Sequence, residues 1–134
     1  MAKIPAEVQE FVKNKTAWVA TASPDGMPNT TPKGSVRVLD DEHIIFADLY
    51  SLKTRENLQK NPKVAVTVID NEKYKGYQFK GAAQLVESGP VFDKVVEELK
   101  KAPMQLPHPK YVVIITVDSV YDQSVGPKAG QRIV

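Results

Sequence analysis

Short apolar runs rich in β-branched residues, separated by tight turn signals, recur along this chain of 134 residues. The clearest are KVAVTVID at 63–70 and YVVIITVD at 111–118. Runs of this length and composition are typical of strands, and strands joined by tight turns favour antiparallel pairing. The segments that favour helices are short, at 5–14, 51–60 and 90–101. The chain is therefore expected to be mostly β, of the α+β type.

The predicted strands must pair within a small sheet with few helices to cover it. They are expected at 16–23, 27–39, 43–49, 63–70, 76–87 and 111–118. Six strands with so little cover predict a closed or half-closed barrel, because closure removes unpaired edges. Pro28 and Pro32 confine the second strand to an edge or to bulges. The tail from residue 120, which contains Gly126 and Gly130, is expected to be irregular.

Composition limits the partners of the chain. Its formal net charge of +2, with both signs mixed along the sequence, argues against nucleic acid. The absence of cysteine and the presence of two separate histidines argue against a metal site. No apolar run reaches the length of a signal peptide or a membrane span, so we expect a cytoplasmic protein that does not bind membranes. A chain this short has little room for both a core and a deep pocket, which favours a dimer.

The segment FADLYSLKT at 46–54 ends a predicted strand and begins a predicted helix at Ser51. The first N–H groups of a helix have no intrahelical partner, and the helix dipole favours negative charge there. Lys53 and Thr54 add an ammonium and a hydroxyl to the same turn. The turn is either a helix start capped by Ser51 with a solvated lysine, or a cradle for a phosphate group.

A second polar cluster, NTTPKGS, occupies residues 29–35. A half-buried strand normally alternates apolar and polar residues, whereas this segment is polar on both faces. It either lies exposed at a sheet edge or lines a polar site.

The chain as a whole resembles the FMN-binding split barrels related to pyridoxamine 5′-phosphate oxidase. Three stretches carry the resemblance in the family's order: ATASPDGMPN at 20–29, IIFADLYSLKTRENLQKNPKVAV at 44–66 and K-G-x-A at 80–83. The resemblance implies one FMN-binding domain over 1–134, built as a six-stranded, antiparallel, Greek-key-like split β-barrel with two to three peripheral helices. It also implies a homodimer with each flavin at the subunit interface.

Carried over residue by residue, the resemblance places the FMN phosphate on the turn of Ser51, Lys53 and Thr54. The other implied cofactor-binding residues are Thr30, Thr31, Pro32 and Lys33 beside the ribityl chain and ring edge, Phe46, Ala47, Asp48 and Leu49 beside the isoalloxazine ring, partly through backbone atoms, and Gln78 from the partner subunit. Lys33 is a candidate for stabilising negative charge on the pyrimidine edge of the ring, with a second phosphate contact or a surface lysine as alternatives. No catalytic side chain and no metal are implied.

The chain departs from authentic pyridoxamine 5′-phosphate oxidases where they use arginine. Leu52 replaces an arginine of their phosphate-binding turn, and Thr31 lies near the position of another. The tail carries one arginine, Arg132, and lacks their basic substrate motif. These differences argue against pyridoxamine phosphate as the substrate.

Two functions fit the resemblance. The first is an FMN-dependent oxidoreductase of unknown substrate, with NAD(P)H or a protein as candidate electron donors. The second is a flavin-binding electron carrier, store or sensor without turnover. Outside FMN chemistry, a split barrel that binds haem or a deazaflavin, or that serves as an interaction domain, remains an alternative.

Overall fold

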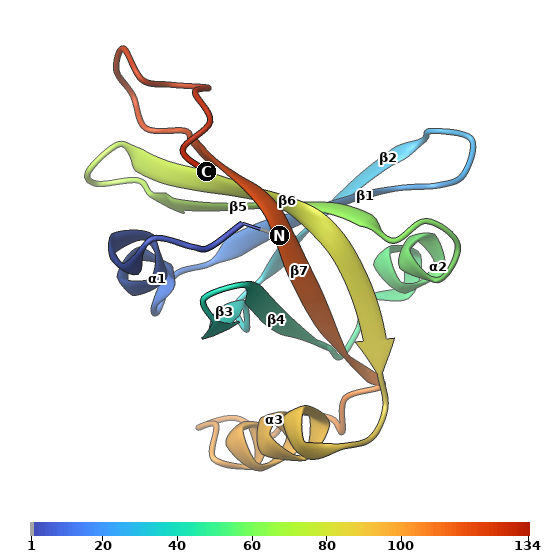
Figure 1. Ribbon diagram of the computed structural model, residues 1–134. Coiled ribbons are helices and arrows are strands. Elements are labelled where there is room, and N and C mark those ends of the chain that lie inside the picture. The colour runs from blue at the N-terminus through green and yellow to red at the C-terminus, as the bar shows by residue number, and fades with distance from the viewer. Residues whose placement is uncertain (1) are drawn as a thin grey trace.

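The computed structural model describes residues 2–134 and confirms the mostly β, antiparallel architecture (Figure 1). In chain order the elements are α1 (Ala6–Val12), β1 (Ala17–Ala22), β2 (Pro28–Lys33), β3 (Arg37–Asp40), β4 (His43–Asp48), α2 (Leu52–Lys60), β5 (Lys63–Asp70), β6 (Lys75–Val86), α3 (Pro90–Lys100) and β7 (Tyr111–Asp122). The strands form one seven-stranded sheet in the order β2-β1-β5-β6-β7-β4-β3. The sheet therefore has one strand more than predicted.

The additional strand arises because the segment predicted as one strand at 27–39 divides in two. β2 pairs with β1, whereas β3 pairs with β4 at the other end of the sheet order. The break falls at residues 34–36, which begin with a glycine. The prediction of a single strand is wrong. The residue pattern indicates extended backbone, but it does not show that the chain leaves β1 and pairs with β4 instead.

This division also shows that the sheet is rolled up. β2 and β3 are its two edges, yet only residues 34–36 connect them. A connection this short spans at most about 14 Å. The edges of a flat seven-stranded sheet would lie roughly 29 Å apart. The sheet must therefore curl until its edges meet, which gives a barrel split between β2 and β3.

The barrel interior holds the main hydrophobic core. Alternate residues of the strands point inward, and Val19, Val66, Phe79 and Ile115 are almost fully buried there. Burying each such side chain contributes about 1.5–3 kcal/mol. Helix α1 adds Val8 and Val12 to the same core, and α2 adds Leu58. Both helices thus pack against the barrel, as Figure 1 shows.

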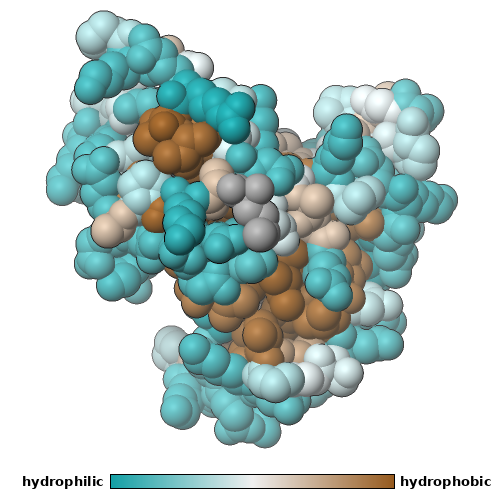
Figure 2. All heavy atoms as spheres, in the orientation of Figure 1, coloured by the Kyte–Doolittle hydropathy of each residue, from teal (hydrophilic) through white to brown (hydrophobic). Residues whose placement is uncertain are grey.

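Helix α3 packs on the outside of the barrel through a second, smaller apolar cluster. Phe92 and Val95 of α3 meet Ile45 and Ala47 of β4 and Val112 of β7. Figure 2 shows apolar side chains gathered where the sheet meets this helix. The outward-facing side chains of β4, Ile45 and Ala47, are therefore buried under α3.

The C-terminal region is more regular than expected. β7 continues to Asp122, where 118 was predicted as its end, because its second half pairs with β6. The chain then loops back, and Arg132 forms a β-bridge with Tyr121. Figure 1 places this tail far from α2, so it does not cover the turn at 51–54 of its own chain.

None of the helices within residues 2–134 combines the length and the apolar character that a membrane crossing requires.

Candidate functional site

The turn between β4 and α2 presents backbone N–H groups. Ser51 precedes the helix, and the first intrahelical bond runs from the Arg55 N–H to the Ser51 carbonyl, 2.7 Å. Within the described chain, no acceptor meets the N–H groups of Leu52, Lys53 or Thr54. Three donors and the positive end of the helix dipole therefore face outward together, which suits an anion.

Ser51 does not cap the helix with its side chain as predicted. Its hydroxyl makes no bond to the helix. Instead the Ser51 N–H donates to Asp48 Oδ1 at 3.1 Å, and the Ser51 hydroxyl accepts a hydrogen bond from the Lys33 ammonium. The serine therefore links Lys33 to the start of α2.

Lys33 reaches this turn from β2. Its side chain is half-buried, and its Nζ lies 5.7 Å from the centroid of the Phe46 ring. Burial lowers the pKa of the Lys33 ammonium, and the negative charge of Asp48 opposes that effect. β2 is one edge of the sheet and β4 lies next to the other edge, so the Lys33–Ser51 bond crosses the split of the barrel.

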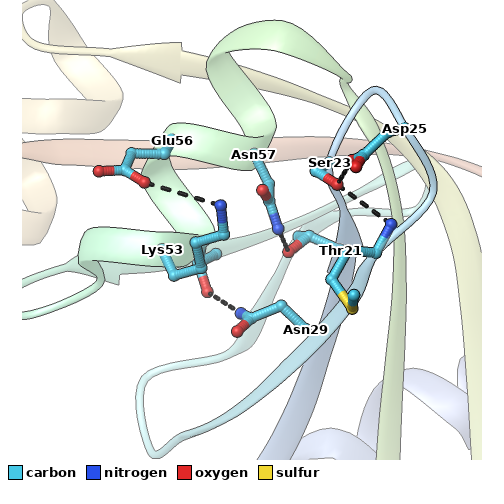
Figure 3. Close-up of polar contacts among 9 residues, drawn as sticks. Thr21, Ser23, Asp25, Asn29, Lys53, Glu56 and Asn57 are labelled. Carbon is cyan, nitrogen blue, oxygen red and sulfur yellow. Dashed lines mark hydrogen bonds and ion pairs between the residues drawn. The ribbon is translucent and has the colours of Figure 1, made fainter.

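Lys53 and Thr54 have different surroundings in the first turn of α2. Thr54 is buried, and its Oγ1 accepts a hydrogen bond from Asn29 Nδ2 at 3.3 Å. Lys53 is exposed, and its Nζ lies 3.8 Å from a carboxylate oxygen of Glu56 (Figure 3). Thr54 thus ties the helix to β2, while Lys53 makes a surface ion pair.

The predicted residues of β2 divide between its two faces. Thr31 and Lys33 alternate with the exposed Thr30 and Pro32. Lys33 contacts the turn before α2 and Asn29 contacts α2 itself, so the face shared by residues 29, 31 and 33 is directed toward the helix. Thr30 and Pro32 lie on the opposite, outer face.

The predicted residues of β4 are largely occupied by packing. Phe46 is buried in the barrel core and Ala47 in the cluster under α3. Both oxygens of Asp48 accept hydrogen bonds from Arg55, at 2.6 and 3.1 Å. Leu49 is partly buried against the α3 cluster. A ligand beside β4 would therefore meet mainly its backbone.

Gln78 lies on the outer face of the barrel, away from the turn at 51–54. Across the sheet, Gln78 of β6 pairs with Thr67 of β5. Thr67 pairs with Trp18 of β1, and Trp18 pairs with Pro32 of β2. Three strand spacings, about 14 Å, therefore separate Gln78 from Pro32. Trp18, on the same outer face, is 40% exposed and does not belong to the barrel core.

A groove of about 680 Å³ lies on the same outer face. It is lined by the small side chains of Ala20, Ala65 and Ala82, with Lys80 and Asp118 also present. The Lys80 ammonium lies 4.7 Å from the centroid of the Tyr121 ring. Small side chains permit a second surface to approach the strands closely.

Comparison with known proteins connects this geometry to a family. The sequence model for the family described as pyridoxamine 5′-phosphate oxidase matches residues 4–124. The chain belongs to this family. An uncharacterized protein of Methanocaldococcus jannaschii is 37% identical over 133 residues, which cover 98% of this chain and 88% of that protein. The resemblance identified from the sequence is therefore confirmed.

Solved structures of similar proteins share the fold of this pyridoxamine 5′-phosphate oxidase family member. HupZ of Group A Streptococcus is 31% identical and superposes with a TM-score of 0.83, covering 95% of this chain and 99% of its own. An FMN-binding protein from Syntrophomonas wolfei subsp. wolfei is 20% identical with a TM-score of 0.74, covering 88% of this chain and 82% of its own. The latter likeness shows the fold alone.

Sequence reasoning missed several residues of this family member's site. Asn29 and Arg55 were not selected, although Asn29 bonds to Thr54 and Arg55 to Asp48. Asp48 was selected for a place beside the ring, and its carboxylate is directed to the helix start. Asn57, which donates to Thr21 Oγ1 at 3.0 Å, also ties α2 to the barrel. The alternation of residues 29, 31 and 33 could have indicated Asn29, whereas the pairing of Arg55 depends on the turn geometry.

Proposed function

We propose that this protein binds FMN, with the phosphate held at the N-terminus of α2 by Ser51, Lys53, Thr54 and Lys33. One observation carries the proposal: the Lys33 ammonium bonds to Ser51 Oγ beside three N–H groups for which the described chain supplies no acceptor. Phosphate oxygens are strong acceptors that suit such a set of donors. The family membership supports the same ligand class.

The donor set fits a phosphate on grounds of charge as well. Lys33 is half-buried, and Asp48, the carboxylate whose charge acts on it, accepts its hydrogen bonds from Arg55 and Ser51. Burial without a bonded counter-ion is unfavourable for an ammonium, and an anion would offset that cost. This location favours the phosphate end of FMN for Lys33 over the pyrimidine edge of the ring.

The ring and ribityl chain would lie against β2 and the end of β4. On β2, Thr31 would meet the ligand with its side chain, whereas Thr30 and Pro32, whose side chains lie on the outer face, would meet it through their backbone. Residues 46–49 would lie on the other side. Because the side chains of Phe46 and Ala47 pack into the two apolar clusters, the β4 contacts would be mainly backbone ones.

We further propose a homodimer in which Gln78 completes the site of the partner subunit. Within one chain Gln78 is separated from β2 by two intervening strands, so it does not reach the same ligand end as Lys33. The alanine-lined groove beside it offers a surface that a second subunit can approach closely. The exposed Trp18 on the same face would gain burial in such a dimer.

The activity that we propose is that of an FMN-dependent oxidoreductase whose substrate is not pyridoxamine phosphate. Bound FMN would supply the electron transfer, while the protein would bind and orient the flavin and provide its electrostatic environment. NAD(P)H or a protein would serve as donor, and we propose a cytoplasmic location for the protein. An electron carrier or flavin store is the second candidate, because the carboxylate at the site, Asp48, is engaged by Arg55 and is not placed to move a proton.

The absorption spectrum of the purified protein tests FMN binding. Flavin bands that survive desalting, and FMN released on denaturation, are expected. A colourless protein that gains no thermal stability with added FMN would refute the proposal. Anaerobic reduction by NADH or NADPH, followed by repeated turnover with an added acceptor, separates the oxidoreductase from the carrier.

A further inference from the structure

Asp48 is a buried carboxylate at the junction of β4 and α2. It is 1% exposed, and both carboxylate oxygens and its backbone carbonyl have hydrogen-bond partners. Oδ2 accepts from Arg55 Nε at 2.6 Å, and Oδ1 accepts from Arg55 Nη2 and from the Ser51 N–H, both at 3.1 Å. Its backbone carbonyl accepts from the Lys110 N–H at 2.9 Å. The residue thus joins β4, the helix start and the segment before β7.

Asp48 holds the residue that precedes the helix. It accepts a hydrogen bond from the Ser51 N–H, while the Ser51 hydroxyl bonds to Lys33 and makes no cap bond to the helix. Tyr50, directly before Ser51, is 83% exposed and gives the turn little support. Asp48 is therefore the residue of β4 that is bonded directly to the start of α2, while Thr54 ties the first turn to β2.

The charge of Asp48 is balanced locally. Its two hydrogen bonds from Arg55 raise the pKa of that guanidinium, and they hold the pair as a bidentate bridge. A buried carboxylate near an anion site would by itself weaken anion binding. Because Arg55 compensates the negative charge of Asp48, we expect Asp48 to affect phosphate binding more through the position it gives to Ser51 than through electrostatic repulsion.

We infer that Asp48 is a positioning residue for the phosphate of FMN: with Arg55 it fixes Ser51 and the first turn of α2, and so determines affinity for the phosphate but not for the flavin ring. The inference rests on the proposed FMN binding. It gives the Asp48 side chain a role at the start of α2, whereas the family resemblance placed this residue beside the flavin ring.

The test compares FMN with riboflavin, which has the same ring and no phosphate. Dissociation constants for both are measured by flavin fluorescence with wild-type protein and with Asp48→Asn. Positioning predicts that the preference for FMN over riboflavin falls about tenfold in Asp48→Asn. A purely electrostatic role predicts the opposite sign, because removal of a negative charge would strengthen phosphate binding.

Thr21→Val is the matched control. It removes the buried Thr21–Asn57 hydrogen bond, which also ties α2 to the barrel but lies away from its first turn. It is expected to lower stability and to keep the preference for FMN. Arg55→Lys, which keeps the positive charge beside Asp48 but loses the bidentate geometry, is the second variant should Asp48→Asn fail to fold, and it is expected to lower the preference in the same direction.

The outcomes separate the inference from the function on which it rests. A wild-type protein that binds neither flavin overturns the proposed function and the inference with it. A wild-type protein that prefers FMN, with a folded Asp48→Asn or Arg55→Lys variant whose preference is unchanged or increased, overturns the inference alone. If Thr21→Val also loses the preference for FMN, the effect of Asp48→Asn would reflect general destabilisation of the fold. That result would also overturn the inference.

Discussion

The Lys33 ammonium on β2 donates a hydrogen bond to the hydroxyl of Ser51, the residue before α2. This bond crosses the split in the barrel between the edge strands β2 and β3. Beside it, the N–H groups of Leu52, Lys53 and Thr54 have no acceptor in the described chain. An anion placed there would meet Lys33 and the helix N-terminus together. The following predictions depend on this arrangement.

Replacing Lys33 with Met removes the charge and keeps most of the apolar stem. We expect weaker FMN binding by about 1.5–3 kcal/mol, roughly ten- to more than a hundredfold, since a charge-assisted hydrogen bond to phosphate is lost. Riboflavin binding should change little. Lys94→Met, on the exposed part of α3, is the matched control. Equal losses for FMN and riboflavin in Lys33→Met would contradict a phosphate role.

The affinity for FMN should depend on pH through Lys33. Burial lowers the pKa of this ammonium below the ordinary lysine value, and only its protonated form attracts phosphate. Affinity is therefore expected to fall as pH rises, beginning at a lower pH than an ordinary lysine would give. Lys33→Arg should remove this decline, because arginine stays charged. Titrations of FMN at several pH values check this, and an identical profile in Lys33→Arg would count against it.

In the proposed complex, Glu56 would compete with the FMN phosphate for the Lys53 ammonium. The pair is a surface ion pair, with 3.8 Å between Lys53 Nζ and the Glu56 carboxylate. Such pairs contribute about 0.2–1 kcal/mol, so Glu56→Gln should strengthen FMN binding by up to about fivefold. The gain should shrink as salt is added. Isothermal titration at low and high salt measures it, and weaker binding in Glu56→Gln would be the contrary result.

Gly81 is required by close packing of β6 against β7. A Cβ atom at this position would collide with the backbone carbonyl oxygen of Thr116, where the register of the two strands shifts. Gly81→Ala is expected to lower the free energy of unfolding by roughly 1–3 kcal/mol. Gly34→Ala, with open space around it, should change it by less than about 0.5 kcal/mol. Urea denaturation compares them, and similar stabilities would show that β7 yields readily.

Local sequence was sufficient for the elements whose signals are local. The run at 63–70 forms β5 with the predicted bounds, and α2 starts directly after Ser51. The division of 27–39 was not predictable, because it depends on closure of the sheet. The same holds for the site: Lys33 meets Ser51 only across the split, and the Asp48–Arg55 pair spans a turn whose geometry residue spacing does not reveal.

The central claim is that the first turn of α2 binds the phosphate of FMN. Backbone amide NMR tests it most directly, by titrating labelled protein with FMN and, separately, with riboflavin. The account predicts saturable shifts of the Leu52, Lys53 and Thr54 amides with FMN, and little change at these three with riboflavin. Binding of FMN that leaves these amides unmoved, or no binding at all, would contradict it.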